Sequence, residues 1–436
     1  MKKALKLTIL ALLIASMVLA TGCSSKKFAQ QEDIVDMPDT EEQEVQEEKV
    51  DKDVEIEIWG WFSFGGAIKQ FEAQNGIKVK ERIISFADCK QEYMEALANG
   101  TGPDVLIFDS SFFGQYTVDD VLENLLQEPY DAAKYRDKII GWESGFSLDN
   151  KKLLSISYST APFITMYRAD IMKENGFPYE PEEFSKFIEN PENLMEIGKK
   201  LRQQGKYIFQ YPTDVSDIAG ATMGHFDDKL NYIRGGEIFA KTLDMAQEIY
   251  DSEMILNRNF WFDNGIKSIK EDKLVMLFLA SYAMDRLETM VPEQKGKWRV
   301  AKAPLGLAAW ATDTRLSING QSKHKKEAWK LIEHIVTTIG VIGNVVPSYI
   351  PATENEDYLS QQKEYFGGQK IYPLLVETAR NMKQYKLTPL DEEAHQLYIQ
   401  GVWDSFYLDE NSYADIERIR KTIEKETAEE KETLLE

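Results

Sequence analysis

Aromatic side chains beside polar residues are the strongest candidates for ligand chemistry in this sequence of 436 residues. A flat aromatic face can cover the C–H surface of a sugar ring, while carboxylates, amides and hydroxyls bind its hydroxyl groups. Six aromatics stand in polar, loop-like sequence: Trp61, Trp261, Tyr282, Trp310, Tyr349 and Trp403. Each of them could instead pack in a core or an interface. We expect at least two of the six to contact a ligand.

The first part of the folded chain alternates between strand and helix patterns. Apolar runs predict strands at 55–59, 77–83 and 105–108, and helical periodicity between them predicts helices at 67–75 and 93–98. This order gives βαβ units and a doubly wound sheet, which makes the fold α/β.

Four candidate residues directly follow two of these strands. Trp61 and Ser63 come after the first strand, and Asp109 and Ser110 come after the third. In doubly wound sheets ligands lie beyond the carboxyl ends of the strands, so we expect all four on one rim. There Asp109 could accept hydrogen bonds from a ligand, or it could cap the helix that follows.

The rest of the chain has a less regular pattern. It predicts a strand at 153–158, mostly helix from there to about 288, an extended segment at 299–305 and a short strand at 316–318. An amphipathic helix at 325–338 should turn four residues inward, namely Ala328, Leu331, Ile332 and Ile335. A charged helix with Glu/Lys pairs should follow from residue 413 onward.

The first 22 residues have the pattern of an export signal. Lys2 and Lys3 precede an apolar run at 7–20, which is too short for a comfortable transmembrane helix. The order Leu-Ala-Thr-Gly before Cys23 resembles the lipobox of bacterial lipoprotein precursors. This resemblance implies cleavage before Cys23 and acylation of that residue, which would anchor the protein firmly. An ordinary secretory signal with an incidental Cys23 is the alternative.

Residues 23–53 have the composition of an acidic, disordered tether. Nine acidic residues lie between Gln30 and Glu48, with no aromatic residue and little apolar content. Such a segment cannot bury enough apolar surface to fold, and its self-repulsion extends it.

The net charge and the spacing of the cysteine, histidine and glycine residues argue against several functions. Without residues 1–22, 48 basic side chains stand against 73 acidic ones, a net charge of −25, so we expect no nucleic-acid partner. With Cys23 acylated, Cys89 has no partner for an intrachain disulfide. The four histidines have no zinc-site spacing, and Arg234-Gly235-Gly236 reads as a turn or helix end rather than a phosphate loop. We expect no metal, no cofactor and no catalysis.

Several segments together carry a family resemblance. They are GIKV at 76–79 with LANGTGPDV at 97–105, LLSISYST at 153–160 with YRAD at 167–170, and EDKLVM at 271–276 with GKWRVA at 296–301 and SKHKKEAW at 322–329. In this order and spacing they resemble extracellular solute-binding proteins of family 1, the substrate-binding lipoproteins of bacterial sugar ABC importers. Two segments depart from the family pattern. WATDTR at 310–315 stands where many relatives have a Gly-Gly-rich turn, and ASY at 280–282 stands where many have a tryptophan.

The resemblance implies a two-lobed, periplasmic-binding-protein-like α/β fold with a ligand cleft between the lobes. The first lobe would hold 54–158 and 304–347, and the second would hold 159–303 and 348–436. Tyr158 would lie where the chain crosses between lobes, either as a ligand contact or as part of a hinge. Tyr282 and Trp310 would lie near the family's ligand-contact regions.

The resemblance also implies a function. The protein would be a lipid-anchored monomer on the outer face of a Gram-positive cell membrane, touching the membrane through its anchor only. It would bind a carbohydrate, an oligosaccharide, by lobe closure and deliver it to an ABC permease. Two alternatives stay open at this point. Acids and aromatics could hold another solute such as a polyamine, and a surface glycosidase could use a carboxylate pair, although pairs are unavoidable among 73 acids.

Overall fold

The expected βαβ units form the first part of the fold. The computed structural model describes residues 54–436 except 119, 339–342 and 409–410. The first elements are β1 (Glu55–Gly60), α2 (Gly65–Asn75), β2 (Lys78–Ile83), α3 (Phe86–Ala98) and β3 (Val105–Asp109). β1 pairs in parallel with β2 on one side and with β3 on the other, with Ile56 opposite Val79 and Ile58 opposite Val105. The parallel sheet predicted from the sequence is therefore confirmed.

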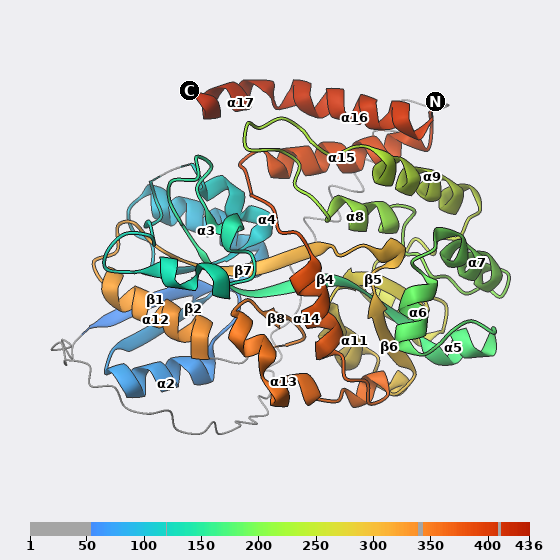
Figure 1. The fold of residues 1–436 in the computed structure, drawn as a ribbon, viewed down its shortest axis with the longest axis horizontal. Helices are drawn as coiled ribbons and strands as arrows, with labels where there is room; N and C mark the ends of the chain where they lie inside the picture. Colours follow the sequence, from blue (N-terminus) through green and yellow to red (C-terminus); the bar gives the residue numbers. More distant parts are fainter. Residues whose placement is uncertain (1–53, 119, 339–342, 409–410) are drawn as a thin grey trace. The chain divides into compact units, whose positions relative to one another are not determined.

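Two long antiparallel strands extend this sheet into the second part of the chain. The sheet has eight strands in the order β2-β1-β3-β7-β4-β5, and β6 and β8 also pair with β4. The added strands are β4 (Ile156–Arg168), β5 (Met276–Ala280), β6 (Trp298–Lys302), β7 (Trp310–Ile318) and β8 (Val346–Pro347). The first half of β4 pairs with β7, and its second half pairs with β5 and β6. β4 and β7 thus connect the two parts of the sheet (Figure 1).

The predicted extent of these strands was wrong in two places. β4 continues through Pro162 to Arg168, where the sequence pattern indicated helix. The ladder tolerates Pro162 because the register shifts between Ala161 and Pro162, which spares the nitrogen that cannot donate. β5 lies inside the stretch expected to be helical, since a fully buried strand has a continuous apolar run rather than an alternating one.

Helices cover the sheet on two sides (Figure 1). The remaining helices are α4 (Ser110–Phe113), α5 (Ala169–Glu174), α6 (Pro181–Phe187), α7 (Pro191–Arg202), α8 (Asp214–Gly220), α9 (Glu237–Asp251), α10 (Asp263–Lys270), α11 (Ala283–Met290), α12 (Lys325–Thr338), α13 (Glu356–Ser360), α14 (Tyr372–Asn381), α15 (Asp391–Ser405), α16 (Ser412–Glu426) and α17 (Ala428–Leu435). α2 and α12 lie on one face of β1 and β2, and α3 and α4 lie on the other.

The predicted amphipathic helix is α12, and its inward face is as expected. Ala328, Leu331, Ile332 and Ile335 are fully buried against β1, β3 and β7. The expected charged helix is α16, where Glu417 pairs with Arg420 and Lys421 at helical spacing. α16 packs with α9 and α15 around a separate apolar cluster that includes Phe239, Val402 and Ile423.

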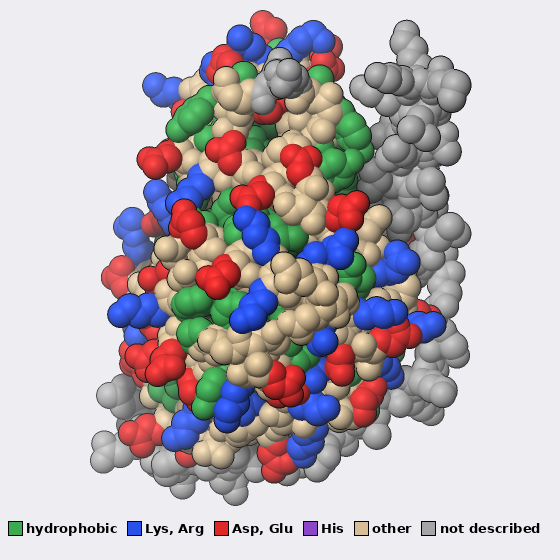
Figure 2. All heavy atoms as spheres, turned by 90° about the vertical axis from the view of Figure 1, so that its right-hand side faces the viewer, with side chains coloured by type: hydrophobic (Ala, Val, Ile, Leu, Met, Phe, Trp, Pro, Cys, Tyr) green, Lys and Arg blue, Asp and Glu red, His purple; other side chains and the backbone are tan. Residues whose placement is uncertain are grey.

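The surface of the chain mixes charges of both signs on the face at the right of Figure 1. Figure 2 shows acidic and basic side chains interleaved over this face, and Lys199 pairs with Glu248 at 2.5 Å between α7 and α9. The excess negative charge of the chain is therefore not gathered there. Among the described residues, no helix has both the length and the apolar character needed to cross a bilayer.

Candidate ligand-binding site

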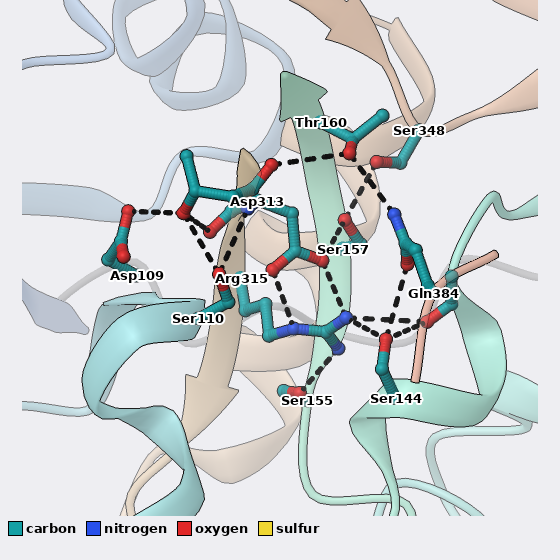
Figure 3. A network of polar contacts seen from close by, with 12 residues as sticks. Asp109, Ser110, Ser144, Ser155, Ser157, Thr160, Asp313, Arg315, Ser348 and Gln384 are labelled. Carbon is teal, nitrogen blue, oxygen red and sulfur yellow. Dashed lines mark hydrogen bonds and ion pairs between the residues drawn. The ribbon is translucent and has the colours of Figure 1, made fainter. Parts of the chain in front are cut away.

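Asp109 and Ser110 lie at the carboxyl end of β3 and are hydrogen-bonded to β7 (Figure 3). The Asp109 carboxylate caps α4, accepting from the backbone N–H of Ser111 at 2.9 Å, and it also accepts from the Thr312 hydroxyl at 2.7 Å. The Ser110 hydroxyl lies 2.9 Å from that of Thr312 and accepts from the backbone N–H of Asp313 at 3.2 Å. Asp109 is 8% exposed, and burial raises its pKa. The capping role weighed for Asp109 is thus present in the structure.

Tyr282 and Trp261 form an exposed aromatic pair close to Asp109. Tyr282 follows β5 and precedes α11, Trp261 precedes α10, and their ring centroids are 5.9 Å apart. Each side chain is 41% exposed, and Arg286 donates to the Trp261 carbonyl at 2.9 Å. Desolvation, and then the negative charge of Asp109, raise the pKa of Tyr282 to about 12. Asp109 is therefore near enough to Tyr282 for its charge to act on the Tyr282 hydroxyl.

Trp61 joins this group through the aromatic residues around it. Its ring contacts Phe86 edge-on at 5.3 Å and Phe112 at 6.4 Å, and Phe112 lies on α4 directly after the Asp109 cap. Trp61 therefore lies beside α4, the helix that Asp109 caps. Ser63 is exposed and engaged elsewhere, donating to Glu81 at 2.6 Å at the start of α2.

Trp310 lies on β7 rather than in the loop that its sequence indicated. Its side chain is 2% exposed and packs edge-on against Tyr385 at 4.8 Å. Its backbone N–H donates to the Ala221 carbonyl at 3.0 Å, directly after α8. The indole N–H has no acceptor among the described residues. Trp310 is therefore buried between β7 and the end of α8 and is not exposed.

Three candidate residues pack within apolar clusters and are not brought to Asp109. Tyr158 is 3% exposed and meets Phe64 edge-on at 5.1 Å. Tyr349 is half-buried 6.3 Å from Tyr135. Trp403 is half-buried 5.5 Å from Phe406, in the cluster of α9, α15 and α16.

A buried ion pair on β7 is hydrogen-bonded to β4 (Figure 3). Asp313 and Arg315 have fully buried side chains joined at 2.5 Å. Asp313 also accepts from the Ser157 hydroxyl at 3.0 Å, and Arg315 donates to Ser155 at 3.2 Å and to Ser144. Every polar end of the pair therefore has a partner, and Thr312 is held in place beside it.

A second group of polar side chains, the Arg234 cluster, was missed as a site by the sequence. It consists of Arg234, Asp217, His225, Tyr232, Asp391, His395 and Tyr398. Arg234 is 5% exposed, donates to the Met223 carbonyl at 3.0 Å and lies 5.5 Å from the ring of Tyr398. Gly236, two residues after Arg234, directly precedes α9 with φ 83°, in keeping with the helix end expected there. Only the fold shows that Arg234 turns inward, because its acidic neighbours come from distant helices.

Titration in the Arg234 cluster gives a pH-dependent stability. Burial raises the pKa of Asp391 to about 6, above the value of about 3.9 of an unfolded chain. Between about pH 4 and pH 6 the folded protein keeps the Asp391 proton while the unfolded chain loses it. As far as Asp391 is concerned, the folded state is therefore most stable below about pH 4 and loses stability as the pH rises through about 6.

We therefore expect the Asp391→Asn variant to gain stability relative to the wild type between pH 4 and pH 7. The gain should be on the order of 1–2 kcal/mol, allowing for partial solvent screening. Urea unfolding of both proteins at several pH values measures it. A difference between the two that does not change with pH would contradict the assignment.

A sizeable cavity in the structure does not coincide with the candidate ligand residues. A cavity of about 570 Å³ lies between Thr117, Ser147, Asp228 and Leu434, and none of the ten candidate ligand residues lines it. Within the described part of the chain, His, Cys, Asp and Glu side chains form no group that could hold a metal ion.

Comparison with known proteins places this fold in a class of two-lobed, periplasmic-binding-protein-like proteins with a ligand cleft between the lobes. Residues 66–358, more than half of the chain, match the family described as bacterial extracellular solute-binding protein. The chain belongs to this family, and the resemblance seen in the sequence is confirmed. No curated protein matches the sequence significantly.

Solved structures agree in fold over nearly their whole length. An extracellular solute-binding protein of family 1 has a TM-score of 0.74 at 19% identity, covering 85% of this chain and 99% of its own. The galacto-N-biose-/lacto-N-biose I-binding protein of an ABC transporter from Bifidobacterium longum, in complex with lacto-N-biose, has a TM-score of 0.69 at 18% identity, covering 88% and 99%. The sugar-binding protein MalE from Xanthomonas citri has a TM-score of 0.68 at 16% identity, covering 88% and 100%. These relatives are binding proteins.

Proposed function

We propose that the protein is a receptor that binds an extracellular oligosaccharide and delivers it to an ABC permease, without chemical change to the sugar. The observation that carries this proposal is the exposed pair of Trp261 and Tyr282 beside the polar group of Asp109, Ser110 and Thr312. Aromatic faces and hydrogen-bonding groups close together are what a sugar ring needs. The lacto-N-biose bound by the Bifidobacterium relative supports the choice of ligand class.

We propose five ligand residues, namely Trp61, Asp109, Ser110, Trp261 and Tyr282. The two carboxylate oxygens of Asp109 each accept one hydrogen bond already, and lone pairs remain for a ligand hydroxyl.

Titration calorimetry with neutral oligosaccharides tests the proposal. Maltotriose, lacto-N-biose and β-1,6-galactobiose serve as probes, and spermidine serves as the competing solute. Sugar binding should change little with salt, whereas spermidine binding would weaken steeply with ionic strength. Spermidine bound more tightly than any of the sugars, or sugar cleaved at enzyme-like rates, would overturn the receptor assignment.

We also propose the division into lobes, 54–158 with 304–347 and 159–303 with 348–436, with closure driven by the ligand. Polar contacts cross this division. Glu392 at the start of α15 pairs with Lys90 of α3 at 2.5 Å and accepts from Gln115 at 2.8 Å. Opening of the lobes would break these contacts while β4 and β7 stay paired.

The leader and anchor complete the proposal, and they fall in residues 1–53, outside the described residues. Cys23 would carry the acyl chains that hold a monomeric receptor on the extracellular side of the cell membrane. Replacing Cys23 with alanine should move the protein from the membrane fraction to the medium. Fractionation of cells followed by immunoblotting measures this shift. A Cys23→Ala protein that is normally processed yet still bound to membranes would exclude acyl anchoring at this residue.

A further inference from the structure

The Arg234 cluster contains buried polar atoms that lack partners. The Nδ1 of His225 and the hydroxyls of Tyr232 and Tyr398 have no hydrogen-bond partner among the described residues. The side chains of His225, Tyr232 and Tyr398 are 4%, 7% and 5% exposed. Buried polar atoms in native proteins almost always have partners, so three orphans in one cluster indicate that a polar molecule belongs beside them.

The cluster also reaches solvent on one side. Asp217 on α8 and His395 on α15 are exposed, and Asp391 and Tyr385 are half-buried. Burial by surrounding atoms nevertheless raises the pKa of Asp217 to about 6 and lowers that of His395 to about 4. Asp217 and His395 are thus open to solvent on one side and closely surrounded by protein atoms on the other.

The cluster lies near the proposed ligand residues around Asp109. Tyr385 packs on Trp310 at 4.8 Å and is close enough to Arg234 for the guanidinium charge to act on its hydroxyl. Trp310 in turn lies two residues before Thr312, whose hydroxyl binds Asp109. Trp310 and Tyr385 therefore connect the Arg234 cluster to the strand that carries Thr312.

The charges of the cluster favour an uncharged ligand. Arg234 has no ion pair within 4 Å among the described residues, and it is attracted by Asp217 and Asp391 at longer range. At neutral pH the lowered pKa values leave His225 and His395 uncharged. A carboxylate on the ligand would meet both aspartates, whereas neighbouring hydroxyls can accept from Arg234 and donate to Asp217.

We propose that the Arg234 cluster is a second ligand subsite, which takes one uncharged sugar ring at the end of the oligosaccharide. This proposal rests on the proposed function. Asp217 accepts from the ring hydroxyls, while Arg234 and the Tyr398 hydroxyl donate to them.

Two conservative variants test the subsite without removing packing. Tyr398→Phe deletes an unpartnered hydroxyl and keeps the ring against Arg234, and Asp217→Asn removes an exposed charge. Calorimetry with maltotriose, lacto-N-biose and β-1,6-galactobiose should show about tenfold weaker binding by each variant of whichever sugar the wild type binds. The melting temperature without sugar should not fall for either variant, and it should rise for Asp217→Asn at neutral pH because burial raises the pKa of Asp217 to about 6. Asp228→Asn, an exposed acid, and Tyr407→Phe, an exposed tyrosine, are matched controls that should bind like the wild type.

The other outcomes separate this proposal from the one on which it rests. If both variants bind like the wild type while Trp261→Ala loses binding, the cluster holds only water and the subsite is rejected, but the receptor function stands. Binding of trigalacturonate in preference to the neutral sugars would reject the uncharged ligand. A wild-type protein that binds none of the four probes would remove the proposed function and this subsite together.

Discussion

Replacing Asp313 with alanine should lower the free energy of unfolding by about 3–5 kcal/mol. Arg315 is fully buried and relies on this carboxylate, which accepts from its Nε at 3.0 Å and from its Nη2 at 2.5 Å. The hydroxyls of Ser155 and Ser144 would remain as partners, but they carry no charge. An uncompensated buried guanidinium loses its hydration and receives little in return, so the folded state is destabilised. Urea unfolding of the purified protein, followed by tryptophan fluorescence, measures the change.

Two further variants give this prediction its controls. Glu417→Ala breaks a half-exposed pair with Arg420 and should cost less than about 1 kcal/mol. Asp313→Leu combined with Arg315→Met removes both charges and should recover most of the lost stability, because apolar replacement of a buried pair is often neutral. A loss below 1 kcal/mol for Asp313→Ala would show that water or rearranged hydroxyls compensate Arg315.

The same ion pair explains why part of the fold was hidden in the sequence. The segment WATDTR reads as a loop because Asp313 and Arg315 are charged, yet they satisfy each other inside β7. The parallel strands β1, β2 and β3 were predictable, since their apolar residues alternate or run together between helices of clear periodicity. Only the start of β4 was predicted, because a proline such as Pro162 normally ends a strand. In the structure Pro162 is tolerated at a register shift.

The neighbourhood of Trp61 and α4 was predictable because neighbouring strands of the sheet precede both of them. Trp61 and Asp109 follow neighbouring parallel strands, β1 and β3. The carboxyl ends of such strands lie at the same edge of the sheet. Arg234 and His395 belong to segments about 160 residues apart, which no local pattern can join. The sequence shows where the aromatic residues are, but not whether each side chain is buried or exposed. Trp403 and Trp261 both stand near acids, yet one packs against Phe406 and the other is 41% exposed.

Removing the Tyr282 side chain should weaken sugar binding by about thirtyfold, or about 2 kcal/mol, with little change in stability. Tyr282 is 41% exposed and contacts Trp261, so its truncation opens no cavity in the core. The loss would come from the aromatic face that covers one side of a sugar ring. Calorimetry with maltotriose and lacto-N-biose measures the affinity, and thermal unfolding without sugar measures the stability.

The chemical nature of the contact follows from three companion variants. Tyr282→Phe keeps the face and should bind nearly as well as the wild type, whereas a hydroxyl contact would make it as weak as Tyr282→Ala. Trp261→Ala should match Tyr282→Ala, and the double variant should lose less than the sum, because the two rings touch and act as one platform. Tyr407→Ala, at a tyrosine that is 64% exposed, is the matched control and should bind like the wild type. Tyr282→Ala with full affinity and a lowered melting temperature would instead make this pair a packing feature of α10 and α11, and the ligand would have to be held from the Asp109 side alone.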